Sequence, residues 1–253
     1  MSIVVAYKYT SNPQDARVGA DGVVDWSRAK PLMSEYDPVA VQVGRAVADA
    51  TGEELVGITV GMAAIGKGMA TKNAMSRGFD RGVIIADDAT ADWNPTRYAS
   101  ALAQIVTSMD GVKLVITGDS SIDNGTRMTS AILGGYLGWP VFQEVEKITA
   151  TDSGFELLQQ VDGGTRTVVV DGPVVVAATS DAMRVPVPSM KEILAAGKKP
   201  VDVRALDTVT VSDTDLRVTG RAKPVARERK QQIFTGDSAV ADLVAALRND
   251  GVL

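Results

Sequence analysis

The chain has 253 residues, of which 45% are hydrophobic and 23% charged, and it carries a formal net charge of −5 at pH 7 with neither histidine nor cysteine. This size and composition suit one α/β domain with extensions, and the acidic balance disfavours a nucleic-acid partner. The missing His and Cys exclude disulfides, thiolate nucleophiles, iron–sulfur clusters, the usual zinc sites and triads with an imidazole base.

The N-terminal run MSIVVAYKYT is too short for the apolar region of a signal peptide. Nowhere do apolar residues continue for the roughly 18 positions that a membrane span requires. We therefore expect a soluble, cytoplasmic protein with no membrane span.

Strand-like and helix-like segments alternate through the first half of the chain. We expect a polar loop over 7–15 and a small hairpin at Asp21-Gly22. Asp37-Pro38 and Asn94-Pro95 are expected to start helices, because Asp and Asn cap helices and Pro suits the first position. The alternation predicts a Rossmann-like, mostly parallel sheet covered on both faces. Apolar runs predict strands over 3–6, 55–60, 83–86 and 114–117, and helical periodicity predicts helices over 37–50, 61–77, 95–109 and 128–137.

After Trp139-Pro140 the pattern becomes β-rich and then irregular. Asp162-Gly163-Gly164 is expected to turn a hairpin, and a short helix is expected over 189–196. From 201 to 232 no period persists and 221–230 is strongly basic, which predicts an extended arm. Asp237-Ser238 should cap a last helix with one apolar face, formed by Val240, Leu243, Val244 and Leu247. The added strands are expected over 141–148, 155–161, 165–170 and 173–178.

The stretch LVITGDSSIDNGTRMTSAILGGYLGWP, 114–140, reads as strand, polar loop and helix. In an open α/β sheet, anionic and nucleotide ligands sit where a strand's carboxyl-end loop enters a helix, because free N–H groups and the helix dipole converge there. This loop is our first candidate for a binding site; a polar surface turn is the alternative.

Other motifs carry less chemistry. The segment GMAAIGK over 61–67 nearly matches a phosphate-binding P-loop, but Gly68 stands where a magnesium-binding Ser or Thr is needed. We therefore interpret its small residues as a means of close helix packing. Asp119 and Asp123 could form an acid/base pair, but without a partner we expect them to bind backbone. We expect Lys191, Lys198 and Lys199 to form a solvated face, and Tyr36 and Trp139 to be core or interface residues.

Several segments in fixed order resemble the beta subunit of electron transfer flavoproteins, over essentially the whole chain. The SSIDNG loop and the PSMKEILAAGKKP segment are most similar to the FixA branch of that family. The segments that carry the resemblance are IVVAYK, SEYDPVAV, RGFDRG, LVITGDSSIDNG, LGWP, VDGGTRT and VPSMKEILAAGKKP.

The resemblance implies an electron carrier rather than an enzyme, with a Rossmann-like fold of the adenine nucleotide alpha hydrolase type, added β-strands and a C-terminal arm ending in a helix. It implies a nucleotide-binding domain over 1–182 and a partner-docking segment and arm over 183–253, the arm wrapping an alpha subunit. FAD would be held mainly by that alpha subunit, with AMP or a second FAD in the beta site. The implied partners are a FixB-like alpha subunit, flavin-dependent dehydrogenases and a FixC-like or quinone-side acceptor.

The resemblance also implies the nucleotide contacts, and we expect Gly118 and Gly125 to permit close backbone approach. Tyr36 would face the alpha subunit's flavin, and 183–191 would dock dehydrogenases. This chain has Ser34-Glu35 where the family usually has Asn-Pro, and Asp119-Ser120 where it has Lys-Gln. The implied site residues are Ala6, Ser34, Glu35, Tyr36, Asp37, Val60, Gly118, Asp119, Ser120, Ser121, Ile122, Asp123, Asn124, Gly125, Thr126 and Thr129, with no metal.

Two alternatives stay open. The chain could be an electron-bifurcating subunit with its own FAD, or a stand-alone adenine-nucleotide-binding regulator resembling universal stress proteins. The latter share the sheet but lack the VDGG region and the long arm.

Overall fold

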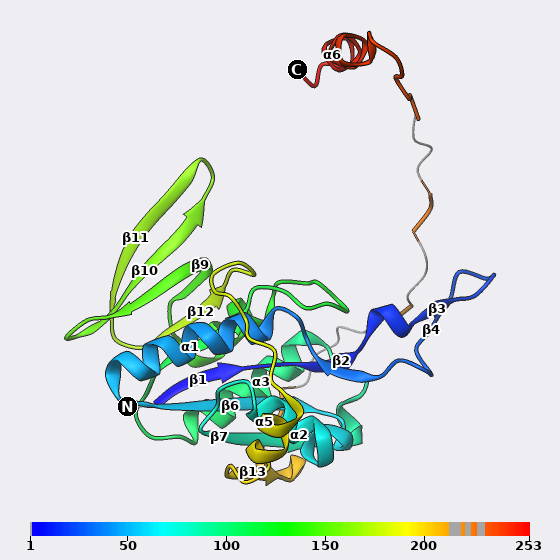
Figure 1. The fold of residues 1–253 in the computed structure, drawn as a ribbon. Helices are drawn as coiled ribbons and strands as arrows, with labels where there is room; N and C mark the ends of the chain where they lie inside the picture. The colour runs from blue at the N-terminus through cyan, green and yellow to red at the C-terminus, as the bar shows by residue number, and fades with distance from the viewer. Residues whose placement is uncertain (1, 213–218, 221–223, 227–230) are drawn as a thin grey trace. The chain divides into compact units, whose positions relative to one another are not determined.

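The computed structural model describes residues 2–212, 219–220, 224–226 and 231–253 (Figure 1). The chain divides into two compact units, Met1–Arg221 and Ala222–Leu253. The first unit holds the sheet and the candidate site. The second contains the helix α6 (Ala239–Asn249).

A nine-stranded sheet runs through the first unit in the order β11-β10-β9-β12-β8-β1-β6-β7-β13. The seven strands from β9 to β13 in this order pair in parallel, and β10 and β11 continue the sheet as an antiparallel hairpin beside β9. This confirms the predicted Rossmann-like sheet with added strands. The strands are β1 (Ser2–Ala6), β6 (Glu54–Gly61), β7 (Arg81–Ala86), β8 (Val112–Gly118), β9 (Val141–Ala150), β10 (Gly154–Val161), β11 (Gly164–Asp171), β12 (Val174–Ala178) and β13 (Val201–Arg204).

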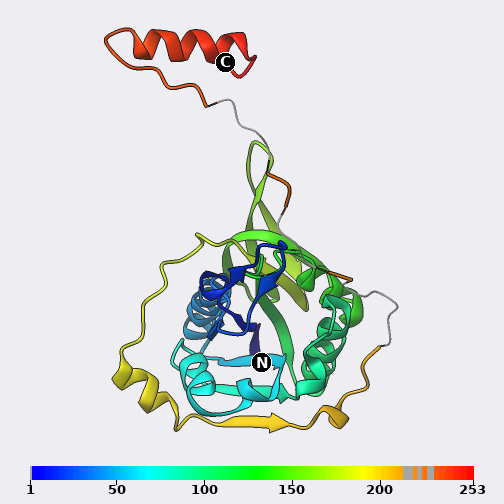
Figure 2. The same ribbon diagram turned by 90° about the vertical axis from the view of Figure 1, so that its right-hand side faces the viewer.

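Helices cover both faces of the central part of the sheet, so its five central parallel strands, β12, β8, β1, β6 and β7, are mostly buried and read as continuous apolar runs. Ile3 and Val5 of β1 join the core cluster on the side of α1 (Asp37–Thr51) and α2 (Gly68–Met75). Val4 joins the cluster on the side of α3 (Pro95–Thr107) and α4 (Thr129–Leu137), where the half-buried Trp139 also packs. Figure 2 shows the two helix pairs on opposite sides of the sheet.

The segment expected as a loop over 7–15 contains a strand instead. β2 (Tyr9–Ser11) pairs antiparallel with β5 (Pro31–Met33), and a 3₁₀ turn, η1 (Pro13–Asp15), follows. The hairpin expected at Asp21-Gly22 is confirmed by β3 (Arg17–Val18) and β4 (Val24–Asp25). The strand β2 was missed because three residues are too few to show a period, and its partner lies 20 residues further along.

The single helix expected over 61–77 is wrong. The chain forms a 3₁₀ turn, η2 (Ala63–Gly66), and starts α2 only at Gly68, whose φ of +65° interrupts a helix. Gly66 is where small size matters, because a Cβ there would lie 2.7 Å from the Cβ of Ala86. The P-loop-like residues thus pack against β7, as the small-residue interpretation predicted.

The expected helix caps are only partly present. Asn94 caps α3 by accepting a hydrogen bond from the Arg97 amide. Asp37, however, lies inside the first turn of α1, and its carboxylate accepts from the Lys8 amide instead. Ser238 precedes α6 without a side-chain cap bond. Tertiary contacts therefore override the local capping preference at Asp37.

The start of the expected arm is part of the first unit. β13 pairs with β7, and after a 3₁₀ turn, η4 (Leu206–Thr208), residues 209–212 run along α3, where the Gln104 side chain bonds the backbone of Thr210. The helix α5 (Met190–Ala196) precedes β13 and is capped by Ser189. Lys199 is not on a solvated face, since its Nζ donates to the carbonyls of Met75 and Phe79. The basic stretch 221–230 lies outside the described residues except for 224–226.

Two neighbouring glycines of α4 give a matched test of how this helix packs on β9. A Cβ at Gly134 would lie 2.0 Å from Cγ2 of Val141, whereas a Cβ at Gly135 would meet nothing within 4 Å. We expect Gly134→Ala to lower the free energy of unfolding by about 1 kcal/mol or more through overpacking, and Gly135→Ala to raise it by up to about 1 kcal/mol through helix propensity. Urea denaturation of both variants measures this; equal effects would contradict the packing of α4 on β9.

Candidate functional site

The order of strands creates a crevice at the centre of the sheet. From β1 the chain proceeds to β6 and β7 on one side, and then returns to β8 and β12 on the other side of β1. The loops after β1 and β8 therefore diverge at their carboxyl ends. Such a topological switch point is where open α/β sheets bind ligands.

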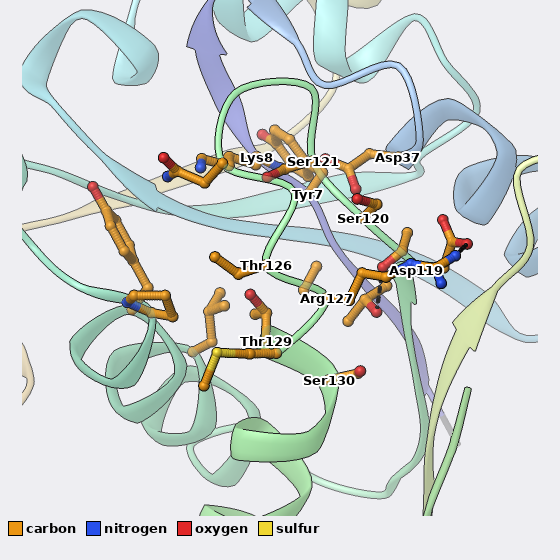
Figure 3. A pocket seen from close by; sticks show the side chains of 18 of the residues that line it. Tyr7, Lys8, Asp37, Asp119, Ser120, Ser121, Thr126, Arg127, Thr129 and Ser130 are labelled. Atoms are coloured by element: carbon orange, nitrogen blue, oxygen red, sulfur yellow. Dashed lines mark hydrogen bonds and ion pairs between the residues drawn. The ribbon is translucent and has the colours of Figure 1, made fainter. Parts of the chain in front are cut away.

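A cavity lies at these strand ends (Figure 3). One part of its wall is apolar and aromatic and comes from the end of β6, the segment before α3 and α3 itself: Val60, Trp93, Pro95, Tyr98 and Leu102. The other part is polar and comes from the loops after β1 and β8, the first turn of α1 and the start of α4. The polar lining residues include Lys8, Asp37, Asp119, Ser120, Ser121, Asn124, Thr126, Arg127, Thr129 and Ser130.

The structure brings most of the predicted site residues to this cavity. The predicted residues that line it are Ala6, Asp37, Val60, Gly118, Asp119, Ser120, Ser121, Asn124, Thr126 and Thr129. The predicted residues outside its lining are Ser34, Glu35, Tyr36, Ile122, Asp123 and Gly125. Among these, Ser34 is buried behind the wall and its Oγ accepts a hydrogen bond from the Ile122 amide at 3.3 Å. Which of them touch a ligand stays a prediction.

Asp37 joins the two loops of the crevice. Its Oδ2 accepts the Lys8 amide at 2.7 Å, and the Gly118 amide also donates to the carboxylate. The side chain is buried, and burial raises the pKa of Asp37 to about 7 although the two amides and the Lys8 charge oppose that shift. Asp37 therefore sits close to its titration point at neutral pH.

Glycine at 118 is required by this junction. A Cβ there would lie 2.7 Å from Oδ1 of Asp37 and 2.9 Å from the Cβ of Tyr36. At Gly125 a Cβ would meet only ordinary contacts, but the φ of +58° favours glycine. The start of α1 thus occupies the space that a side chain at 118 would need, while Gly118 itself lines the cavity.

Lys8 holds the loop after β8 through the side chain of Asp123. Its Nζ lies 2.9 Å and 2.7 Å from the two carboxylate oxygens of Asp123, and Thr10 Oγ1 donates to Oδ2 at 3.0 Å. Burial opposes ionisation, but the hydrogen bond and charge of Lys8, with hydrogen bonds from the Ser121 hydroxyl and the Asn124 amide, hold the pKa of Asp123 below its usual range. Asp123 therefore anchors the loop through Lys8 and through Thr10 of β2. It also accepts the Asn124 amide, so the expected backbone contact is present beside the side-chain contacts.

Asp119 has a different partner, Arg127. The Arg127 guanidinium reaches Asp119 Oδ2 at 2.8 Å and Glu144 Oε1 at 3.2 Å. Arg127 (φ 54°) and Glu144 (φ 56°) are the non-glycine residues with positive φ in the described chain, a conformation that L-residues adopt at a cost. The strained backbone at Arg127 and the ion pair with Glu144, which is also strained, therefore hold the Arg127 guanidinium against the buried Asp119 carboxylate.

Several lining residues were missed by the sequence analysis. Lys8 lies in the short segment between β1 and β2, so the same strand-end rule that selected the loop after β8 could have found it. Trp93 and Tyr98 flank the predicted helix start at Asn94-Pro95 and form an edge-on pair with ring centroids 5.6 Å apart. Arg127 lies inside the predicted loop, but no sequence signal marks its contacts. Among the described residues, no cluster of acidic side chains is arranged to bind a metal ion.

The chain is similar to a known protein family over most of its length. The model described as "Electron transfer flavoprotein domain" matches residues 21–209, which include β5 to η4 and most of the cavity wall. Within the described part of the chain, none of the helices has the length and apolar content needed to span a bilayer.

The buried Asp37 makes stability depend on pH. Because its folded pKa of about 7 exceeds the unfolded value of about 3.9, the folded state holds a proton between these pH values that the unfolded state has released. Stability should fall as pH rises from about 4 to about 7, by at most about 1.4 kcal/mol per pH unit, and then level off.

Asp37→Asn should remove this decline, so the wild-type stability relative to that variant decreases across the window. Urea denaturation over a pH series measures it. Asp49→Asn, at an exposed carboxylate of the same helix, is the control. A constant difference between wild type and Asp37→Asn from pH 4 to 8 would refute the effect.

Proposed function

Because this chain belongs to the electron transfer flavoprotein family, we propose that it is the beta subunit of a heterodimeric electron carrier, most similar to the FixA branch. FAD supplies the redox chemistry when bound, and a FixB-like alpha subunit holds most of that cofactor. This chain provides one wall of the flavin's surroundings and its own nucleotide site. Electrons pass from flavin-dependent dehydrogenases to a FixC-like or quinone-side acceptor, and the chain works in the cytoplasm.

The cavity is the observation that carries the nucleotide proposal. An adenine base suits the wall of Val60, Trp93 and Tyr98, because aromatic and apolar side chains can stack on it. A phosphate suits the start of α4, whose first turn has no side-chain cap bond, so its N–H groups and dipole can bind an anion. The proposed occupant is AMP, and a second FAD in the bifurcating alternative.

The second unit supports an interaction with another chain. On α6 the side chains of Val240 and Leu243 are 75% and 46% exposed, although they belong to its apolar face. Near α5, Val187, Met190 and Leu194 are likewise more than half exposed. We propose that α6 docks on the alpha subunit and that residues 183–191 meet dehydrogenases, with Tyr36 near the alpha subunit's flavin.

A stand-alone nucleotide-binding regulator is the rival function. Such a protein would also use a cavity at the switch point, but it would have no need for the exposed apolar faces of α6 and α5. Size-exclusion chromatography of the chain with and without its alpha subunit separates the two. A stable monomer or homodimer that ignores the alpha subunit would favour the regulator.

The main experiment is to co-purify the chain with its alpha subunit, release bound nucleotides by heat, and quantify FAD and AMP by chromatography. One FAD and one AMP per heterodimer would support a simple carrier, and two FAD would support bifurcation. Absence of both co-purification and nucleotide would refute the proposal.

A substitution pair on α6 tests the docking. We expect Leu243→Asp to weaken the heterodimer by about tenfold or more, because it places a charge in an apolar interface. Ala245→Asp adds the same charge on the opposite side of the helix and should have little effect. Equal dissociation constants for the two variants, measured by titration of the alpha subunit, would contradict docking through this face.

A further inference from the structure

The Asp119 carboxylate is only half satisfied. Its side chain is 7% exposed, and Arg127 binds Oδ2 at 2.8 Å. The other oxygen, Oδ1, is buried and has no hydrogen-bond partner among the residues that the structure describes. A buried carboxylate oxygen without a partner is costly, so such an atom in a cavity wall points to a hydrogen-bond donor from a ligand.

The surroundings keep Oδ1 available. Arg127 is bound to Glu144 as well as to Asp119 Oδ2, and its backbone carbonyl accepts from the Gln143 side-chain amide at 3.0 Å. The same Gln143 amide donates to Ser130 Oγ at 3.2 Å. These contacts hold the guanidinium on one oxygen of Asp119, a residue that lines the cavity, and leave the other oxygen without a partner among the described residues.

The chemistry of an ionised carboxylate restricts which group can bind there. Oδ1 can only accept a hydrogen bond, and it repels phosphate oxygens. Lys8 and Arg127, the cations of the cavity wall, are both already bound to carboxylates. Of the groups that a nucleotide offers, a hydroxyl or an amino group can therefore donate to Oδ1, whereas an ionised phosphate cannot.

The position of Asp119 separates these two possibilities. The aromatic wall around α3 suits the base, and in Figure 3 Asp119 and Arg127 lie at the end of the cavity away from α3. We propose that Asp119 Oδ1 accepts a hydrogen bond from a ribose hydroxyl of the bound adenine nucleotide. This inference rests on the proposed nucleotide site and adds a selectivity: Asp119 favours ribonucleotides over their deoxy analogues and fixes the direction of the nucleotide.

The test measures binding of AMP, 2′-deoxy-AMP and 3′-deoxy-AMP to the full chain, purified with its alpha subunit and freed of bound nucleotide. Loss of the hydroxyl that meets Asp119 should raise Kd by about tenfold or more, since hydrogen bonds to charged groups are the stronger class. In Asp119→Ala, AMP and the deoxy analogue that binds weakly to wild type should have nearly equal Kd values. Asp152→Ala removes an exposed carboxylate between β9 and β10, outside the cavity lining, and should keep the wild-type ratio.

Each remaining outcome is informative. Equal Kd values for all three ligands in wild type, or a ratio that survives in Asp119→Ala, would overturn the inference but leave the nucleotide site intact. A loss seen only with inosine 5′-monophosphate would overturn it by placing the base's amino group on Asp119. If neither AMP nor FAD binds to wild type, the proposed function fails together with the inference. Should Asp119→Ala fail to fold, Asp119→Asn and the wild-type ligand series still decide.

Discussion

The buried carboxylate of Asp37 is the contact on which the geometry of the cavity depends. Asp37 belongs to the first turn of α1. Its carboxylate accepts hydrogen bonds from the backbone amides of Lys8, just after β1, and of Gly118, at the end of β8. Three segments that are distant in sequence are thereby fixed at the switch point of the sheet. Because an unpaired buried carboxylate is strongly disfavoured, displacement of any of the three would leave this group unsatisfied.

Two ion pairs hold the loop after β8 at two further places. Asp123 is bound by Lys8, and Asp119 by Arg127 with Glu144 behind it. The carboxylates and cations of the wall neutralise one another, so binding of an anion depends on backbone N–H groups more than on free positive charge. The apolar wall from α3 completes a cavity that is divided between an apolar, aromatic side and a polar side.

The sequence predicted the central strands and most helices because their apolar runs and periods are local properties. It also predicted the loop after β8, since strand ends at a switch point follow from alternation alone. It could not predict β13 or β2, which are short and exist through pairing with distant strands. Nor could it predict that Asp123 pairs with Lys8, 115 residues away, or that Arg127 turns back on Asp119 through a positive φ.

The pairing of β13 with β7 also bears on aggregation. Without β13, the apolar strand β7 would present an open row of N–H and C=O groups, on which strands of other molecules can build. β13 covers that edge with four residues, and its exposed edge carries the ion pair of Asp202 and Arg204 at 2.7 Å. A short, charged strand is a poor template for further pairing, so this small element, which sequence periodicity does not reveal, protects the β7 edge of the sheet from self-association.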